Sequence, residues 1–271
     1  MSFESKPLGL PVPARGSVAI PLVLAVMALL ALASVAWGVH RGLASDGSRD
    51  LQWSGAHVLW LGLDPSRTFL ACQHTACADF FILSQYPNYP ISALMSLLPL
   101  GALPWAVAKP AWLVVTLAAT GILYWCARTD LAKHLDARLL ALVFLLLLIS
   151  TPYRNVLSNG QEAIFALATF AVALRQARRG QTAIAGLCLA LSWSKFTLTF
   201  PLSLVFVARR DWRVIAIAAA VHAVLTLAAA AWTGTDPVAA TFGFLGVAKL
   251  AIDYRFGFLD VNSIAAHLAL P

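Results

Sequence analysis

Long apolar runs separated by short polar stretches set the pattern of this chain. The first run, 18–39, is long enough to cross a bilayer as an α-helix. It is too long for the core of a signal peptide and lacks a small-x-small cleavage site, so we interpret it as a retained helix. The pattern predicts further apolar helices at 91–107, 111–127, 139–150, 161–174, 214–232 and 238–252.

The stretch 91–127 allows two topologies. Three prolines divide it into short pieces, namely Pro99, Pro104 and Pro110. Two crossings would leave the following loop, 128–138, outside the cell, whereas one crossing with a re-entrant piece would leave it inside. The basic residues of that loop favour the inside.

Another apolar run, 180–208, carries one lysine, Lys195, near its middle. Arginines flank it on both sides: Arg175, Arg178 and Arg179 before, and Arg209, Arg210 and Arg213 after. Because basic clusters prefer the cytoplasmic face, both ends favour the same side, and we predict a hairpin of two short helices turning near Lys195. Each arm of about 14 residues reaches roughly 21 Å, less than a hydrocarbon core of about 30 Å. The alternative is one long tilted helix whose Lys195 packs against a neighbour.

The longest polar stretch, 40–90, is expected to form the first outer loop. A basic tail, 1–16, places the N-terminus in the cytoplasm, so the first helix delivers the chain outward. Loops of this size are more often functional than simple connectors. Within it, 51–63 has apolar residues at helical spacing, which predicts a helix lying along the outer membrane face.

Composition agrees with this pattern. Hydrophobic residues make up 60% of the chain and charged residues 11%, with a mean hydropathy of +0.79. We therefore predict an all-α polytopic membrane protein, a single integral domain over 1–271 with roughly eight transmembrane helices and a large first extracytoplasmic loop. The net charge of +7 comes mostly from basic residues in short loops, where they orient the chain, and indicates no nucleic-acid partner.

Two ionisable residues stand out as chemical candidates. Lys195 would lie at the outer end of a pocket inside the membrane, where an ammonium is costly without an anionic partner such as a lipid phosphate. Asp50 lies just before the helix predicted at 51–63, where two roles remain open. It can cap that helix, or it can act as a general base at the membrane surface.

Further polar candidates lie near the start of the run 161–174. Arg154, Asn159 and Gln161 stand at its mouth, and Gln161 can both donate and accept hydrogen bonds to a sugar hydroxyl. For Asn159 the alternative is helix capping. Tyr86 begins the string Tyr86-Pro-Asn-Tyr-Pro90, where an interfacial aromatic belt is the alternative to substrate contact.

Several kinds of catalytic machinery are absent from the sequence. It contains no phosphate-binding loop of the Walker kind, no dinucleotide fingerprint, no zinc-protease motif and no Gly-x-Ser-x-Gly elbow. The sequence therefore argues against ATP hydrolysis, zinc proteolysis and serine esterase chemistry, and we assign no metal ligands.

Four strings in a fixed order carry a family resemblance: Ser158-Asn-Gly-Gln161, Arg178-Arg-Gly-Gln-Thr-Ala-Ile-Ala-Gly186, Ser194-Lys195 and Arg209-Arg-Asp-Trp212. Over about residues 45–263 the chain resembles glycosyltransferase family 87 of the GT-C superfamily, which includes polyprenol-phosphate-mannose-dependent mannosyltransferases. Asp50, Gly62-Leu-Asp-Pro65 and Tyr86-Pro also fit. Phe196 departs from the proline that commonly follows the family's lysine, and Asn88 departs from a second proline. Family members are usually longer, with further helices after 262–263, so the alternatives here are a fragment or a truncated member.

The resemblance implies a GT-C-like bundle in the cell membrane with its active face outside the cytoplasm. It implies transfer of a hexose, expected to be mannose, from a polyprenyl-phosphate donor to a lipid or glycan acceptor, with no organic cofactor. Asp50 would take the acceptor proton with inversion, and Lys195 with Arg154 would neutralise the departing phosphate. Gln161 and His57 would contact the sugar.

Two other interpretations of the function remain open. The first is a polyprenyl-phosphate transporter or flippase, which would also need a basic residue in the membrane, although the sequence shows no inverted repeat of the kind found in many transporters. The second is an inactive truncated paralogue. Loss of Asp50 without a phenotype would favour either of them over the enzyme.

Overall fold

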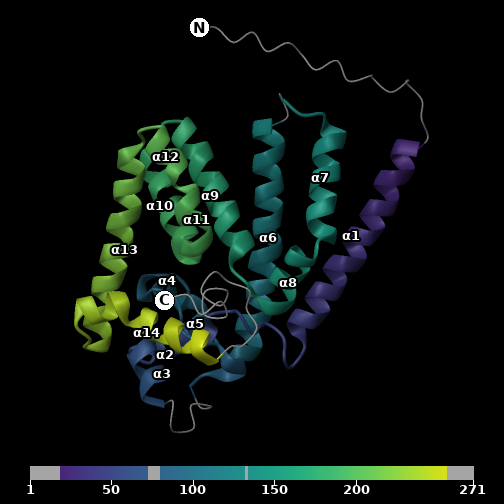
Figure 1. Ribbon diagram of the computed structural model, residues 1–271. Coiled ribbons are helices and arrows are strands. Elements are labelled where there is room, and N and C mark those ends of the chain that lie inside the picture. The colour runs from purple at the N-terminus through teal and green to yellow at the C-terminus, as the bar shows by residue number, and fades with distance from the viewer. Residues whose placement is uncertain (1–18, 73–79, 132–133, 255–271) are drawn as a thin grey trace, which may run out of the picture.

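The computed structural model describes residues 19–72, 80–131 and 134–254, and within these ranges every regular element is a helix (Figure 1). The all-α prediction is therefore confirmed for the described part of the chain. The predicted cytoplasmic tail, 1–16, and the 262–263 region lie outside the described residues.

Several helices are long and apolar enough to cross a membrane. By length and composition four segments of the described chain qualify: Pro21–Leu43, Trp105–Leu131, Thr182–Leu202 and Trp212–Thr233. A fifth is possible if α7 (Ala137–Ile149) and α8 (Thr151–Asn159), which meet at a bend of 53°, form one span. The chain is thus a multi-pass membrane protein. The count is lower than the roughly eight predicted, because that number treated several short apolar runs as crossings.

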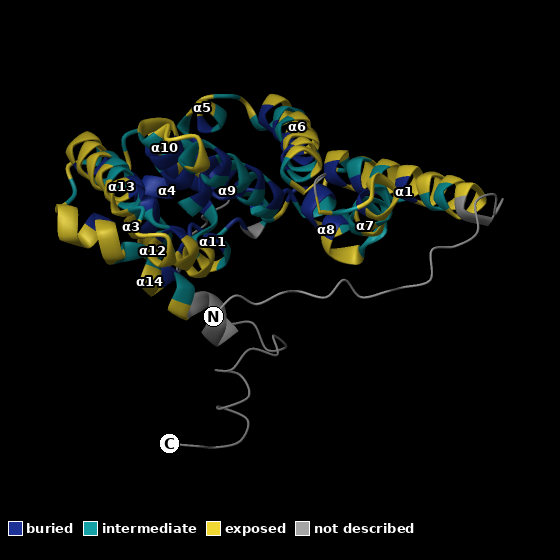
Figure 2. Ribbon diagram, turned by 90° about the horizontal axis from the view of Figure 1, so that it is seen from above, coloured by how far each residue is buried: buried dark blue, intermediate teal, exposed yellow. Residues whose placement is uncertain are grey.

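The outward faces of the long helices are apolar. In α1 (Ala19–Leu43), Leu22, Leu29 and Leu32 are each more than 60% exposed. Figure 2 shows the same exposed character along α13 (Trp212–Thr233), while residues facing the interior between α4 and α9 are buried. Such continuous apolar surface is unfavourable in water and suits contact with lipid.

The stretch 91–131 forms one long helix preceded by short turns. These elements are α4 (Ile91–Ser96), α5 (Leu98–Gly101) and α6 (Trp105–Leu131). The break predicted at Pro110 is wrong, because α6 continues through it. An internal proline costs about 3 kcal/mol, and burial of the neighbouring Ala108 and Trp112 offsets this cost. The arrangement matches the alternative with one crossing, and the end of α6 and the start of α7 lie at the same end of the bundle as the start of α1 (Figure 1).

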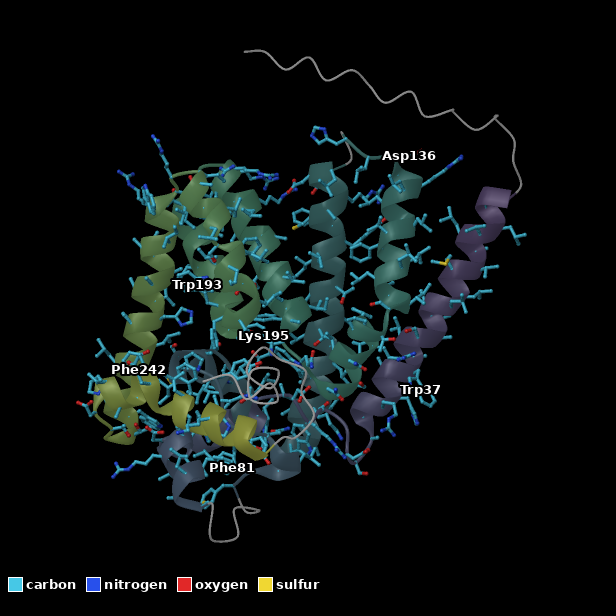
Figure 3. The ribbon with its side chains drawn as sticks, viewed as in Figure 1. Trp37, Phe81, Asp136, Trp193, Lys195 and Phe242 are labelled. Atoms are coloured by element: carbon cyan, nitrogen blue, oxygen red, sulfur yellow. The ribbon has the colours of Figure 1, made fainter. Side chains whose placement is uncertain are left out.

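The segment around Lys195 reverses direction. It comprises α10 (Thr182–Ser192), the 3-10 turn η4 (Trp193–Lys195), α11 (Phe196–Leu202) and α12 (Leu204–Ala208). Trp193 Nε1 donates to Ser203 Oγ at 2.9 Å, although ten residues of a straight helix would separate them by about 15 Å. Length alone would count Thr182–Leu202 as one span, but this hydrogen bond requires a hairpin, and Lys195 lies at its tip (Figure 3).

The arginines that flank the hairpin lie at the end of the bundle opposite its tip. Arg175, near the end of α9 (Ala163–Arg178), is almost fully buried and pairs with Asp130 of α6. Its guanidinium lies 4.4 Å from the centroid of the Trp125 ring and donates to Thr129. This buried contact ties α6 to α9 at the end where the arginine-flanked turns gather.

A layer of short helices closes the other end of the bundle. It contains α2 (Trp53–Trp60), α3 (Pro65–Ala71), η3 (Ile82–Ser84), α4 and α5, with α14 (Pro237–Tyr254) across it (Figure 1). We expected 51–63 to lie along the membrane face, but most of α2 is buried. The close approach of Gly101 to Ala56 explains this, since a Cβ at Gly101 would lie 2.5 Å from the Ala56 carbonyl.

Candidate functional site

The loop after α1 is joined by backbone hydrogen bonds to the last two residues of α8. The Ser48 N–H donates to the Ser158 carbonyl at 2.8 Å, and the Asp50 N–H donates to the Asn159 carbonyl at 2.7 Å. Gly160 ends α8 with a φ of +71°, a conformation that favours glycine. These contacts place Asp50 against the end of α8, where the turn to α9 begins.

The Asp50 side chain points to this turn. Gln161 Nε2 donates to Asp50 Oδ2 at 2.9 Å, across 111 residues of sequence. The residue at the N-cap of α2 is Gln52, with no side-chain capping bond. Of the two roles left open for Asp50, capping of α2 is therefore not the one adopted.

Lys195 contacts a tyrosine from the other side of the fold. Its Nζ donates to Tyr89 Oη and lies 4.9 Å from the centroid of the Tyr89 ring. Burial, and then the charges of Glu162 and Asp50, raise the pKa of Tyr89 far above its usual range. The phenol of Tyr89 therefore stays protonated. Glu162 and Asp50 lie close enough for their charges to change its pKa.

Glu162 completes the group. Its side chain is fully buried, and neither carboxyl oxygen has a hydrogen-bond partner among the described residues. Burial raises the pKa of Glu162 to about 8, against a smaller lowering effect of the Lys195 charge. At neutral pH this carboxyl is therefore largely in its acid form.

These five residues form what we call the polar cluster: Asp50, Tyr89, Gln161, Glu162 and Lys195. It combines a carboxylate oriented by an amide, a cation paired with a phenol, and a neutral carboxyl group. Such a set can accept a proton, bind an anion and donate hydrogen bonds at one place. Within the described residues, no group of three or more His, Cys, Asp or Glu side chains could hold a metal ion.

The other predicted site residues have different surroundings. His57 Nδ1 bonds to the Gly101 carbonyl at 2.8 Å, and its ring stacks on Trp53. The Tyr86 ring packs edge-on against Phe69. Arg154 Nη2 contacts the Thr151 hydroxyl at 3.4 Å. The structure therefore joins Gln161 and the Asn159 backbone directly to Asp50, and Lys195 to Tyr89, whereas the hydrogen bonds described for His57 and Arg154 go to residues outside the polar cluster.

Sequence reasoning missed Tyr89 and Glu162 as site residues. Tyr89 was visible in the same string as Tyr86, but only the fold shows which of the two tyrosines meets Lys195. Glu162 carried little signal in the sequence, because an acidic residue at the start of a helix is ordinarily explained by its favourable interaction with the helix dipole.

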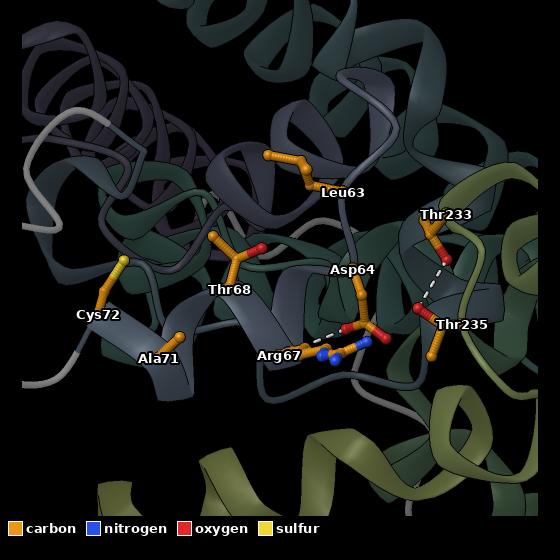
Figure 4. A pocket seen from close by; sticks show the side chains of 8 residues that line it. All are labelled: Leu63, Asp64, Arg67, Thr68, Ala71, Cys72, Thr233 and Thr235. Atoms are coloured by element: carbon orange, nitrogen blue, oxygen red, sulfur yellow. Dashed lines mark hydrogen bonds between the residues drawn. The ribbon is translucent and has the colours of Figure 1, made fainter.

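A separate cavity of about 470 Å³ lies between α3 and the α13–α14 turn (Figure 4). Threonine hydroxyls contribute to its lining, and those of Thr233 and Thr235 lie 3.0 Å apart. Asp64, also in the lining, caps α3 by accepting from the Arg67 N–H at 3.0 Å. No residue of the polar cluster lines this cavity.

Comparison with known proteins agrees with the family resemblance noted above. The model of glycosyltransferase family 87 matches residues 87–271, which include all of the polar cluster except Asp50. Searches of curated proteins and of solved structures find no match for this chain. Because the family match covers well over half of the sequence, this multi-pass membrane protein belongs to glycosyltransferase family 87 and is a glycosyltransferase.

Proposed function

We propose that this enzyme transfers a hexose, mannose by family analogy, from a polyprenyl-phosphate donor to a lipid or glycan acceptor. One observation carries the proposal: a carboxylate oriented by Gln161 and an ammonium paired with Tyr89 belong to the same polar cluster. Inverting sugar transfer needs a proton acceptor on one side of the sugar and a charge to meet the leaving phosphate. Asp50 and Lys195 supply these two groups.

The reaction follows from these roles. The acceptor hydroxyl attacks the anomeric carbon, its proton passes to Asp50, and the bond from that carbon to the phosphate oxygen breaks. The electron pair of that bond leaves with the phosphate, whose charge Lys195 neutralises. The hydrogen bond from Gln161 keeps the Asp50 carboxylate facing the reacting groups.

The remaining predicted contacts belong to the same proposal. Gln161 also reaches sugar hydroxyls, and Arg154 supports the phosphate. Asn159, His57 and Tyr86 are the other substrate-contact candidates. The chain would form one integral domain of the GT-C type in the cell membrane, without an organic cofactor.

Orientation rests on charge. The arginine-flanked turns of α9, α10, α12 and α13 share one end of the bundle, and basic turns favour the cytoplasm. The tip of the hairpin at Lys195 points away from that end (Figure 3). The active face would then open to the extracytoplasmic side, where the predicted first outer loop, 40–90, lies.

A lipid-carrier flippase is the second candidate. The pair of Lys195 and Tyr89 would suit it, since it also must hold a phosphate. A proton-accepting carboxylate held by an amide is superfluous for transport, so the bond between Asp50 and Gln161 favours the enzyme. An inactive truncated paralogue would show neither activity.

The test is transfer of radiolabelled mannose from polyprenyl-phosphate-mannose in membranes that carry this chain, beside its Asp50→Asn variant. Transfer that disappears in the variant supports both the reaction and the base. Transfer that persists unchanged in the variant contradicts the role of Asp50. Movement of the intact donor across the bilayer without transfer would favour the flippase.

Gly160→Ala is expected to lower transfer by on the order of tenfold or more, because small displacements of catalytic groups are costly. A Cβ at Gly160 would lie 3.0 Å from Leu51 Cβ and 3.2 Å from Ser48 Cβ, so the loop that carries Asp50 must shift. Gly180→Ala is the matched control. Gly180 has a φ of +74° but nothing within 4 Å of its Cβ position, so it shares the backbone strain without the crowding. Equal activity losses in the two variants would contradict this explanation.

A further inference from the structure

Glu162 is the one ionisable side chain of the polar cluster that has neither a hydrogen-bond partner among the described residues nor a task in the proposed reaction. It lies in the turn between α8 and α9, outside the candidate spans, and is 0% exposed. Neither of its oxygens has a hydrogen-bond partner in the described part of the chain, and no salt bridge there includes it. An unpaired buried carboxylate costs several kcal/mol, so a retained one calls for a ligand or a proton.

The surroundings of Glu162 point to the donor phosphate. Gln161, the preceding residue, bonds to Asp50, and the helix that follows, α9, packs against the η4 turn that ends in Lys195. The Lys195 charge acts on Glu162, and the Glu162 charge acts on Tyr89. Glu162 therefore belongs to the end of the cluster where the proposed function places the leaving phosphate.

We propose that Glu162 is a further substrate-binding residue, whose protonated carboxyl group donates a hydrogen bond to a non-bridging oxygen of the donor phosphodiester. This inference rests on the proposed function. Only the acid form has a proton to donate, and an ionised Glu162 would instead repel the phosphate anion. Donor binding is therefore coupled to protonation of Glu162.

The coupling has a definite sign. Burial raises the pKa of Glu162 to about 8, so the binding-competent acid form prevails below that pH and is lost above it. Between about pH 7 and about pH 9 the protonated fraction of such a group falls about tenfold, and donor affinity is expected to fall by the same factor.

The other groups at the site do not account for a change in donor affinity between about pH 7 and about pH 9. The charged and titratable groups around Glu162 are Lys195 on η4, whose charge acts on Glu162, and Tyr89 before α4, on which the charges of both Glu162 and Asp50 act. The raised pKa of Tyr89 keeps its phenol neutral throughout this range. The phosphodiester of the donor keeps one negative charge. A pH dependence that comes from Glu162 must therefore vanish when Glu162 cannot ionise.

The experiment measures binding of polyprenyl-phosphate-mannose to the purified full chain in lipid nanodiscs, at about pH 7 and about pH 9. The wild-type affinity is expected to fall about tenfold. Glu162→Gln keeps a hydrogen-bond donor and stays neutral, so its affinity should change less than twofold between the two pH values. Glu162→Leu, which has no donor, should bind more weakly than Glu162→Gln at both. A wild-type affinity that does not change overturns the proposal without any variant.

A wild-type slope that persists in Glu162→Gln also overturns the proposal, since another group would then titrate. Lys195→Ala separates this inference from the proposed function. If Lys195→Ala binds the donor as tightly as the wild type, the proposed phosphate site itself is wrong. If Lys195→Ala weakens binding while the Glu162 variants behave like the wild type, only the role of Glu162 is wrong.

Discussion

Asp50→Asn is expected to reduce the rate of sugar transfer by roughly 10²- to 10⁴-fold, the range that general-base catalysis contributes. Asparagine has nearly the same shape, and its side-chain oxygen can still accept the hydrogen bond that Gln161 donates to Asp50 Oδ2 at 2.9 Å. The geometry of the site should therefore persist while the proton acceptor is lost. Donor binding should change little, because in the proposed site Lys195, and not Asp50, holds the phosphate.

Asp46→Asn is the matched control for this variant. Asp46 lies in the same loop but is partly exposed, and it pairs with Arg41 at 3.6 Å and Arg49 at 3.4 Å. Surface ion pairs of this kind contribute only about 0–1 kcal/mol. The measurement is the transfer rate of each purified variant at saturating donor. The rate of Asp46→Asn should stay near the wild-type value, whereas that of Asp50→Asn should fall. A turnover of Asp50→Asn equal to that of the control would rule out Asp50 as the base.

Lys195→Ala is expected to weaken donor binding by about 1.5–3 kcal/mol, or roughly 10- to 150-fold in Kd. The ammonium lies at the tip of the hairpin beside Tyr89, at the end of the cluster assigned to the phosphate. Its removal would leave the phosphate of the proposed donor complex without its cation. Titration of the purified protein with polyprenyl-phosphate-mannose measures the change directly.

One variant of Lys195 and one of its partner Tyr89 separate the effect of charge from that of packing. Lys195→Arg keeps the positive charge, so its affinity for the donor should be higher than that of Lys195→Ala. If Lys195 only supported the fold, keeping the charge would not raise donor affinity. Tyr89→Phe keeps the ring under Lys195 and removes only the hydroxyl, so its loss should be smaller than that of Lys195→Ala. Equal Kd values for the wild type and Lys195→Ala would show that Lys195 supports the fold and does not bind the donor.

Local sequence patterns were sufficient for the long helices and for the turn at Lys195. The run 214–232 corresponds closely to α13, because an uninterrupted apolar stretch of this length has few alternatives in a membrane, and the run 238–252 corresponds to α14 although Lys249 interrupts it. The reversal at Lys195 was also predictable, since the arginines on both sides require both ends of 180–208 to face one side. These properties depend on neighbours in the sequence and on the bilayer.

Packing between distant segments decided the rest. Pro110 does not break α6 because buried neighbours offset its cost, and most of α2 is buried among other helices because Gly101 lets its backbone approach Ala56 closely. Asp50 meets Gln161 across 111 residues, and Lys195 meets Tyr89 across 106. Amphipathic period and charge bias carry no information about such pairs, since they describe one helix at a time. The residue types of the site and the family could be inferred from the chain, but the partner of each side chain is a property of the folded bundle.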